Sequence, residues 1–130
     1  MIKKEMLDKR VWAVVGATPN REKYGYKIWK KLLDHGYETY GINPKYDYIQ
    51  EEKIYTSLKE VPKKIDVIDL VVPSKVSLKT LEEAKELDID YMWFQPGTYD
   101  DKVIEKATEL GFKILYNECI LATLNELEKK

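Results

Sequence analysis

The chain has 130 residues, the size of a single domain, and a domain of that length can form an ordinary core without disulfides or metal ions. Its content of 44% hydrophobic and 35% charged residues excludes the disordered and membrane-spanning classes. The 22 Lys and Arg residues are balanced by 23 Asp and Glu residues. That balance argues against nucleic-acid binding, which requires a strongly basic face.

The N-terminus and the cysteine content favour a cytoplasmic protein that folds as one domain over residues 1–130. The first five residues lack the apolar segment of a signal peptide, and no apolar run approaches the roughly 20 residues that cross a membrane. Cys119 is the single cysteine, so no internal disulfide can form. No cluster of Cys and His has the spacing of metal ligands.

Strand and helix patterns alternate along the chain. Apolar segments predict strands at residues 11–15, 37–42, 67–72, 91–94 and 112–116. Apolar residues at helical spacing predict helices between these strands, and Gly36 and Gly111 are expected to end two of them. Thr98 with Asp101 is predicted to form a capping box, and Asn117 is predicted to cap the last helix.

The stretch between the second and third predicted strands has no clear periodicity. Residues 44–56 are polar and are predicted to be irregular, and residues 57–60 have the spacing of a short capped helical turn. Strands separated by helices pair in parallel through right-handed crossovers. The prediction is therefore an α/β protein with a three-layer, doubly wound, Rossmann-like fold around a five-stranded parallel sheet.

The residues that follow the predicted strands are polar or loop-forming, whereas the strands themselves are apolar. In a sheet of this kind, ligands bind beyond the carboxyl ends of the strands. The corresponding segments are residues 16–21, 43–45, 72–75, 95–97 and 117–119. We therefore expect these segments to surround a ligand.

The first of these segments has the character of a phosphate-binding loop. Gly16 ends the first strand, and backbone N–H groups at the start of the next helix can bind a phosphate together with the Thr18 hydroxyl. Arg21, Lys23 and Lys45 are candidates to supply positive charge. The alternative is that Gly16 only makes a tight turn and that the basic side chains are solvated.

The glycine pattern narrows the choice of nucleotide. Thr18 and Arg21 occupy the places of the second and third glycines of the dinucleotide fingerprint. An NAD site also requires an acidic residue after the second strand, where this chain has Asn43, Pro44 and Lys45. A lysine suits a phosphorylated ribose. NAD is therefore disfavoured, while NADP and coenzyme A both stay open.

Five motifs, in order, resemble those of the small stand-alone CoA-binding proteins. They are Gly16-Ala17-Thr18, Asn43-Pro44-Lys45, Val72-Pro73-Ser74, Trp93-Phe94-Gln95-Pro96-Gly97 and Asn117-Glu118-Cys119. The resemblance covers roughly residues 8 to 125. The sequence is similar, more distantly, to the CoA-binding domain of the succinyl-CoA synthetase alpha subunit.

The resemblance implies a CoA or acyl-CoA ligand and assigns parts of it to the motifs. Residues 16–20 would hold the phosphates, and Lys45 would contact the phosphorylated ribose. Residues 72–74 would line the path of the nucleotide or pantetheine, and the last two motifs would form the far wall. The residues expected at the ligand are Gly16, Ala17, Thr18, Pro19, Asn20, Arg21, Lys23, Asn43, Pro44, Lys45, Val72, Pro73, Ser74, Gln95, Pro96, Gly97, Asn117 and Cys119.

The chain also departs from the family pattern in its first loop. Pro19 removes an amide donor from that loop. Arg21 and Tyr24 are bulky where the synthetase loop is richer in glycine.

No residue is predicted to be catalytic. The synthetase reaction uses a phosphorylated histidine on a further domain, whereas His35, the one histidine, lies at a predicted helix end and suits a helix-capping cation. Cys119 follows the last strand near a helix N-terminus, where a thiolate is stabilised. It is either a candidate for a mixed disulfide with CoA or a small residue packed under the last helix.

The sequence is therefore compatible with three functions. The first is a non-catalytic CoA-binding protein that acts as a carrier, sensor or regulator. The second is an NADP-binding oxidoreductase or redox-sensing nucleotide-binding protein. The third is an interaction module with a degenerate nucleotide site. The aromatic-rich composition is also compatible with a homodimer.

Overall fold

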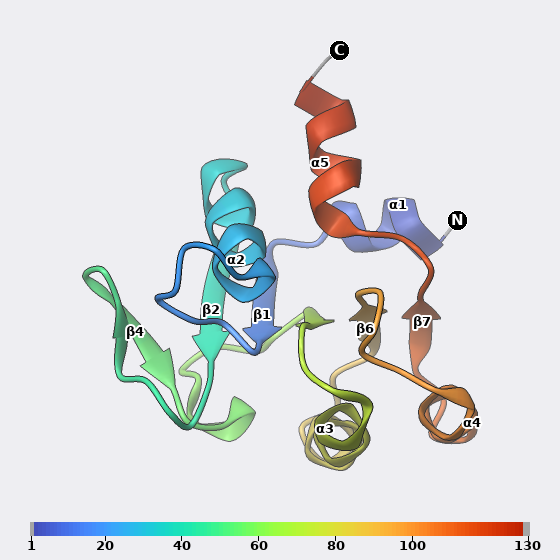
Figure 1. The fold of residues 1–130 in the computed structure, drawn as a ribbon. Coiled ribbons are helices and arrows are strands. Elements are labelled where there is room, and N and C mark those ends of the chain that lie inside the picture. Colours follow the sequence, from blue (N-terminus) through green and yellow to red (C-terminus); the bar gives the residue numbers. More distant parts are fainter. Residues whose placement is uncertain (1, 129–130) are drawn as a thin grey trace.

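The computed structural model describes residues 2–128 and has an α/β architecture (Figure 1). The helices are α1 (Ile2–Leu7), α2 (Tyr24–Asp34), η1 (a 3-10 turn, Leu58–Glu60), α3 (Ser74–Glu86), α4 (Asp101–Glu109) and α5 (Ile120–Glu128). The strands are β1 (Val11–Val15), β2 (Glu38–Ile42), β3 (Tyr48–Ile49), β4 (Glu52–Tyr55), β5 (Val67–Leu70), β6 (Tyr91–Phe94) and β7 (Lys113–Leu115).

The strands of the described chain form one mostly parallel sheet of seven, in the order β3-β4-β2-β1-β5-β6-β7. Only β3 runs antiparallel, to β4. The prediction of five parallel strands was therefore incomplete, because residues 44–56 contain a small hairpin. Its strands have two and four residues, and Ile49 and Ile54 are its only buried side chains. So short and charged a segment gives almost no periodic signal.

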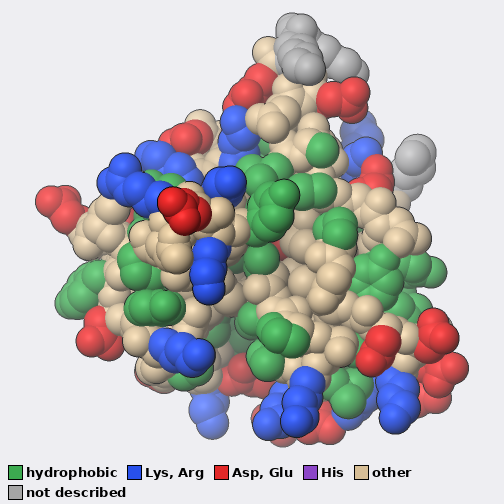
Figure 2. Space-filling model, viewed as in Figure 1, with side chains coloured by type: hydrophobic (Ala, Val, Ile, Leu, Met, Phe, Trp, Pro, Cys, Tyr) green, Lys and Arg blue, Asp and Glu red, His purple; other side chains and the backbone are tan. Residues whose placement is uncertain are grey.

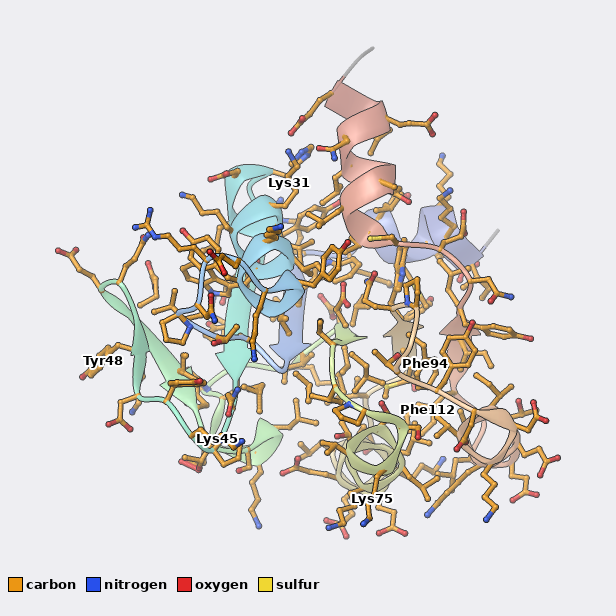
Figure 3. All side chains as sticks on the ribbon, in the orientation of Figure 1. Lys31, Lys45, Tyr48, Lys75, Phe94 and Phe112 are labelled. Carbon is orange, nitrogen blue, oxygen red and sulfur yellow. The ribbon has the colours of Figure 1, made fainter. Side chains whose placement is uncertain are left out.

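Helices cover both faces of the sheet, as the three-layer prediction requires (Figure 1). Strand β1 shows how the core divides, because its side chains alternate between the two faces. Trp12 and Val14 pack in the cluster that α1, α2 and α5 cover, whereas Ala13 and Val15 pack in the cluster under α3 and α4. Phe94 lies on this second face, between β6 and the layer of α3 and α4 (Figure 3).

Three predicted side-chain caps were wrong, and one helix was missed. Ser57 precedes η1, as predicted, but its side chain caps no backbone N–H. The α4 N-cap is Asp100, whose side chain accepts a hydrogen bond from the Val103 N–H, while Thr98 donates to the Gln95 carbonyl instead. Helix α5 begins at Ile120, three residues after Asn117, and Asn117 has a φ of 67°, so it is not the cap of that helix. Helix α1 was missed because it has only six residues and buries a single side chain, that of Met6.

No helix among residues 2–128 is both long enough and apolar enough to span a bilayer.

Candidate functional site

The order of strands reverses between β1 and β5, which are neighbours at the centre of the sheet. The chain leaves β1 through α2 toward β2, and it leaves β5 through α3 toward β6 on the other side. The two connections therefore diverge from adjacent strand ends and leave a crevice between them, which is where open α/β sheets bind ligands.

Two glycines allow the backbone to close tightly at this crevice. Gly16 has a φ of +104°, and a Cβ there would lie 2.5 Å from the Val71 carbonyl oxygen and 2.8 Å from the Val72 side chain. Gly25 is buried in the first turn of α2, where a Cβ would overlap the Gly16 carbonyl oxygen. The pair fixes the distance between the β1 loop and the start of α2, a role that the fingerprint glycines play elsewhere.

The loop between β1 and α2 is held by its own side chains. Thr18 is buried, and its hydroxyl accepts a hydrogen bond of 3.2 Å from the Asn20 N–H. The Asn20 carboxamide in turn accepts one of 3.0 Å from the Glu22 N–H. Helix α2 then begins after Lys23 with no side-chain cap. The Tyr26 and Lys27 N–H groups already donate to the Lys23 carbonyl. The amides of Tyr24 and Gly25 are left for an anion, and the helix dipole favours one there.

Three adjoining cavities follow this edge of the sheet. The central cavity has about 540 Å³ and is lined by Gly16, Thr18, Glu22, Lys23, Tyr24, Gly25, Asn43, Lys45, Tyr46, Val71 and Val72. The hairpin-side cavity has about 380 Å³ and is lined by Val15, Gly16, Ile42, Asn43, Pro44, Lys45, Thr56, Ser57, Leu58, Val72, Pro73, Val76, Thr80 and Glu83. The α5-side cavity has about 170 Å³ and is lined by Tyr24, Ile28, Val71, Gln95, Pro96 and Cys119.

Shared residues join the three cavities into one continuous path. Asn43 and Lys45 border both the hairpin-side and the central cavities, and Tyr24 and Val71 border both the central and the α5-side cavities. The Lys45 side chain follows β2, where the hairpin-side cavity meets the central cavity (Figure 3). Hydrophobic side chains gather on the surface between α2 and the start of α5, toward the α5-side end of the path (Figure 2).

The loop after β2 is ordered by Asn43. Its carboxamide donates to the Ala17 carbonyl at 3.0 Å and accepts from the Lys45 N–H at 2.9 Å. The Asn43 side chain thus links the β1 and β2 loops. It also fixes the backbone from which the exposed Lys45 side chain extends. Lys23 and Lys45 bring positive charge to the central cavity, and Glu22 brings one negative charge.

A buried carboxyl lies behind the α5-side cavity. Asp69 on β5 is fully buried, and its Oδ1 accepts a hydrogen bond of 2.7 Å from the Gln95 side chain. Its Oδ2 has no partner among the described residues. Burial raises the pKa of Asp69 well above its usual value, and the hydrogen bond from Gln95 opposes that rise. An unpartnered buried oxygen also penalises the charged form, so the neutral acid is favoured.

The structure brings most of the predicted residues to the path but leaves several beside it. Asn117 and Cys119 border a further surface cavity of about 510 Å³ at α5, and Cys119 also faces the α5-side cavity. The predicted residues that line none of the cavities named here are Ala17, Pro19, Asn20, Arg21, Ser74 and Gly97. Asn20 instead shapes the loop, and the Arg21 guanidinium lies over the Tyr26 ring, 5.8 Å from its centre.

Sequence reasoning missed several wall residues. Val76, Thr80 and Glu83 line the hairpin-side cavity from α3. Their spacing of four and three residues places them on one face of the helix. That spacing could have pointed to them, because a helix was already predicted in this part of the chain. Gly25 carried no signal, because its role depends on how close the β1 loop comes.

The one histidine of the sequence lies away from the path. His35 follows α2 as its C-cap, and its ring nitrogen lies 2.9 Å from the Glu128 carboxylate. Within residues 2–128, no three His, Cys, Asp or Glu side chains are placed to hold a metal ion.

The fold and its crevice define a Rossmann-like α/β domain. The sequence pattern of the CoA binding domain family matches residues 10–125, so the chain belongs to that family. The protein YneT of Bacillus subtilis is 30% identical over 119 residues, which cover 90% of this chain and 87% of YneT. A solved structure of a hypothetical protein from Pyrococcus horikoshii is 35% identical with a TM-score of 0.90, covering 98% of this chain and 89% of that one.

Longer proteins contain the same domain. The ADP-forming acetate–CoA ligase of Methanocaldococcus jannaschii is 34% identical over 116 residues, or 83% of this chain. Those residues amount to 16% of the ligase. The chain thus spans a small part of the ligase relatives it matches, between 16% and 26% of their length in three of them.

Proposed function

We propose that the protein binds coenzyme A or an acyl-coenzyme A along the path of the three cavities and catalyses no reaction on it. One observation carries the proposal: the uncapped start of α2 lies in the middle of a continuous path, with a lysine toward one end and apolar walls at the other. CoA has the matching order of groups, with a phosphorylated ribose and adenine, then a diphosphate, then an uncharged tail.

The path fits that order of groups. The diphosphate would lie in the central cavity, against the first amides of α2 and close to Lys23. Lys45 would pair with the phosphate on the ribose. The hairpin-side cavity, with Leu58, Val72 and Pro73 among its walls, would receive the adenine. The tail would then run past Tyr24 and Val71 toward Cys119.

The relatives support the ligand but not a reaction. The ligase names state an activity with acetate and CoA, and this chain corresponds to a small part of those proteins. His35, the one histidine of the sequence, lies at the C-terminal end of α2, and the central cavity lies at the N-terminal end. These two facts support a binding role, as a carrier, sensor or regulator.

NADP is the competing ligand, because Lys45 could also pair with a 2′-phosphate. The apolar α5-side cavity favours CoA, whose tail ends in a thiol or an acyl thioester. Thermal unfolding with CoA and with NADP separates the two. A ligand at 100 times its dissociation constant adds roughly 2.7 kcal/mol, and about 1 kcal/mol moves the midpoint of so small a domain by several degrees. A shift with CoA alone supports the proposal, whereas a shift with NADP alone, or with neither, contradicts it.

A further inference from the structure

The α5-side cavity differs from the other two in its size and in its walls. It has about 170 Å³, and Ile28, Val71, Pro96 and the ring of Tyr24 give it largely carbon walls. Among residues 2–128, no lysine or arginine lines it. A small cavity of this kind suits an uncharged, apolar group rather than a phosphate or a sugar.

The floor of this cavity is fixed. Gln95 is only 3% exposed, and both ends of its carboxamide form hydrogen bonds. Its nitrogen donates to the Asp69 carboxyl at 2.7 Å, and its oxygen accepts from the Ile120 N–H at 3.1 Å. Ile28 is also fully packed in the core. The cavity therefore cannot deepen without breaking buried hydrogen bonds or disturbing the core.

The cavity lies where the end of the tail would arrive. Tyr24 and Val71 connect it to the central cavity, and Cys119 is at its far wall. A ligand with its phosphates at the start of α2 and its ribose phosphate at Lys45 directs its sulfur toward this cavity. A free thiol would leave the apolar walls unfilled, whereas an acyl chain on the sulfur would cover them and gain the burial of its methylene groups.

We infer that this cavity receives the acyl chain of a short-chain acyl thioester of about two to six carbons, an inference that rests on the proposed function. The upper limit comes from volume, since an apolar cavity of about 150 Å³ holds one benzene molecule, with its six carbons. Longer chains have to leave the cavity and stay in water, so their extra methylene groups bring no further gain.

The test is the affinity of the whole chain for a series of CoA thioesters. Dissociation constants for CoA and for its acetyl, butyryl, hexanoyl and palmitoyl thioesters are measured by calorimetry. The expected result is a rise in affinity up to about six carbons, by at most about fourfold for each fully buried methylene group. Affinity that stays flat from CoA to hexanoyl-CoA, or that is greatest for palmitoyl-CoA, overturns the inference.

A matched pair of variants places the effect at the cavity. In Cys119→Leu the larger side chain fills the space, so the ratio of the dissociation constants of CoA and butyryl-CoA should fall to about one. In Ala122→Leu the same kind of enlargement on α5 borders only the further surface cavity, so the ratio should stay as in the parent. The inference is wrong if Cys119→Leu keeps the parent ratio. Failure of CoA itself to bind the parent would instead refute the proposed function, and the inference with it.

Discussion

Asp69 and Gln95 form a buried hydrogen bond of 2.7 Å that joins the centre of β5 to the loop after β6. Gln95 also contacts α5, because its side-chain oxygen accepts a hydrogen bond from the Ile120 N–H. A carboxyl in the interior thus positions both the floor of the α5-side cavity and the first residue of the last helix. The arrangement depends on Asp69 staying neutral, because its second oxygen has no partner among the described residues.

The free energy of unfolding of Asp69→Asn, relative to that of the parent, should increase as the pH rises. The folded pKa of Asp69 lies above the unfolded value, so the folded state keeps a proton that the unfolded state loses above pH 3.8. Parent stability therefore falls by up to about 1.4 kcal/mol per pH unit between that value and the raised pKa. Asparagine has no proton to lose. Urea unfolding at several pH values from 4 to 8 measures the difference.

Asp90→Asn is the control for this experiment, since Asp90 is exposed. Its stability should follow the parent across the same pH range. A difference between Asp69→Asn and the parent that does not change with pH would show that Asp69 ionises alike in the folded and unfolded states.

Lys45→Ala should weaken the binding of CoA much more than that of dephospho-CoA. Only CoA carries the ribose phosphate, and a hydrogen bond to a charged group contributes about 1.5 kcal/mol at the lower end, or roughly tenfold in affinity. Calorimetry with both ligands measures the two losses. Lys79→Ala removes an exposed lysine that borders none of the three cavities, and it should change neither affinity. Equal losses for both ligands in Lys45→Ala would show that Lys45 does not contact this phosphate.

Gly25→Ala should impair both folding stability and CoA binding. The added methyl group would overlap the Gly16 carbonyl oxygen, so the β1 loop would have to move from the start of α2. Overpacking of this kind costs about 1–3 kcal/mol. Denaturant unfolding and calorimetry report the two effects.

Gly36→Ala provides the comparison at the opposite end of α2. Gly36 has a φ of +85°, and a Cβ added there would meet no described atom within 4 Å, so alanine costs backbone strain only. Stability should fall by about 1–2 kcal/mol, and CoA affinity should stay unchanged. Unaltered CoA binding in Gly25→Ala would show that the loop does not need this close approach.

Cys119 should form a mixed disulfide with CoA under oxidising conditions. Its thiolate attacks CoA disulfide, one protein–CoA disulfide forms, and one CoA thiolate leaves. Intact-mass measurement should show one added CoA that a reductant removes, and Cys119→Ser should gain no mass. An unchanged parent mass after incubation with CoA disulfide would rule out a Cys119 thiol that meets the ligand sulfur.

The central part of the fold follows from local sequence patterns. Strand β1 is apolar at every position because helices cover it on both faces, and such a run is recognisable without any partner. Gly36 and Gly111 end α2 and α4 with positive φ values, as the predicted stop signals required. The edge of the sheet on which the cavities lie then follows from the parallel order of the strands.

The remaining features depend on contacts between distant parts of the chain. The hairpin of β3 and β4 reverses at Gln50, which has a φ of 55°. The turn contains no glycine or asparagine, the residues that would have predicted it. The first amide of α5 is satisfied by Gln95, which is 25 residues away, so a cap sought in the neighbouring sequence was misplaced. Tertiary partners of this kind leave no periodic pattern.

Val71 and Val72 are consecutive residues at the tip of β5, and between them they border all three cavities. The hydrogen bond from the Val71 N–H to the Val15 carbonyl, 2.9 Å long, anchors this tip to the neighbouring strand. A ligand group in either half of the crevice therefore contacts at least one of these two residues. Fragments that mimic the two halves of the ligand would each immobilise the same peptide unit, so the first to dock lowers the entropic penalty for the second.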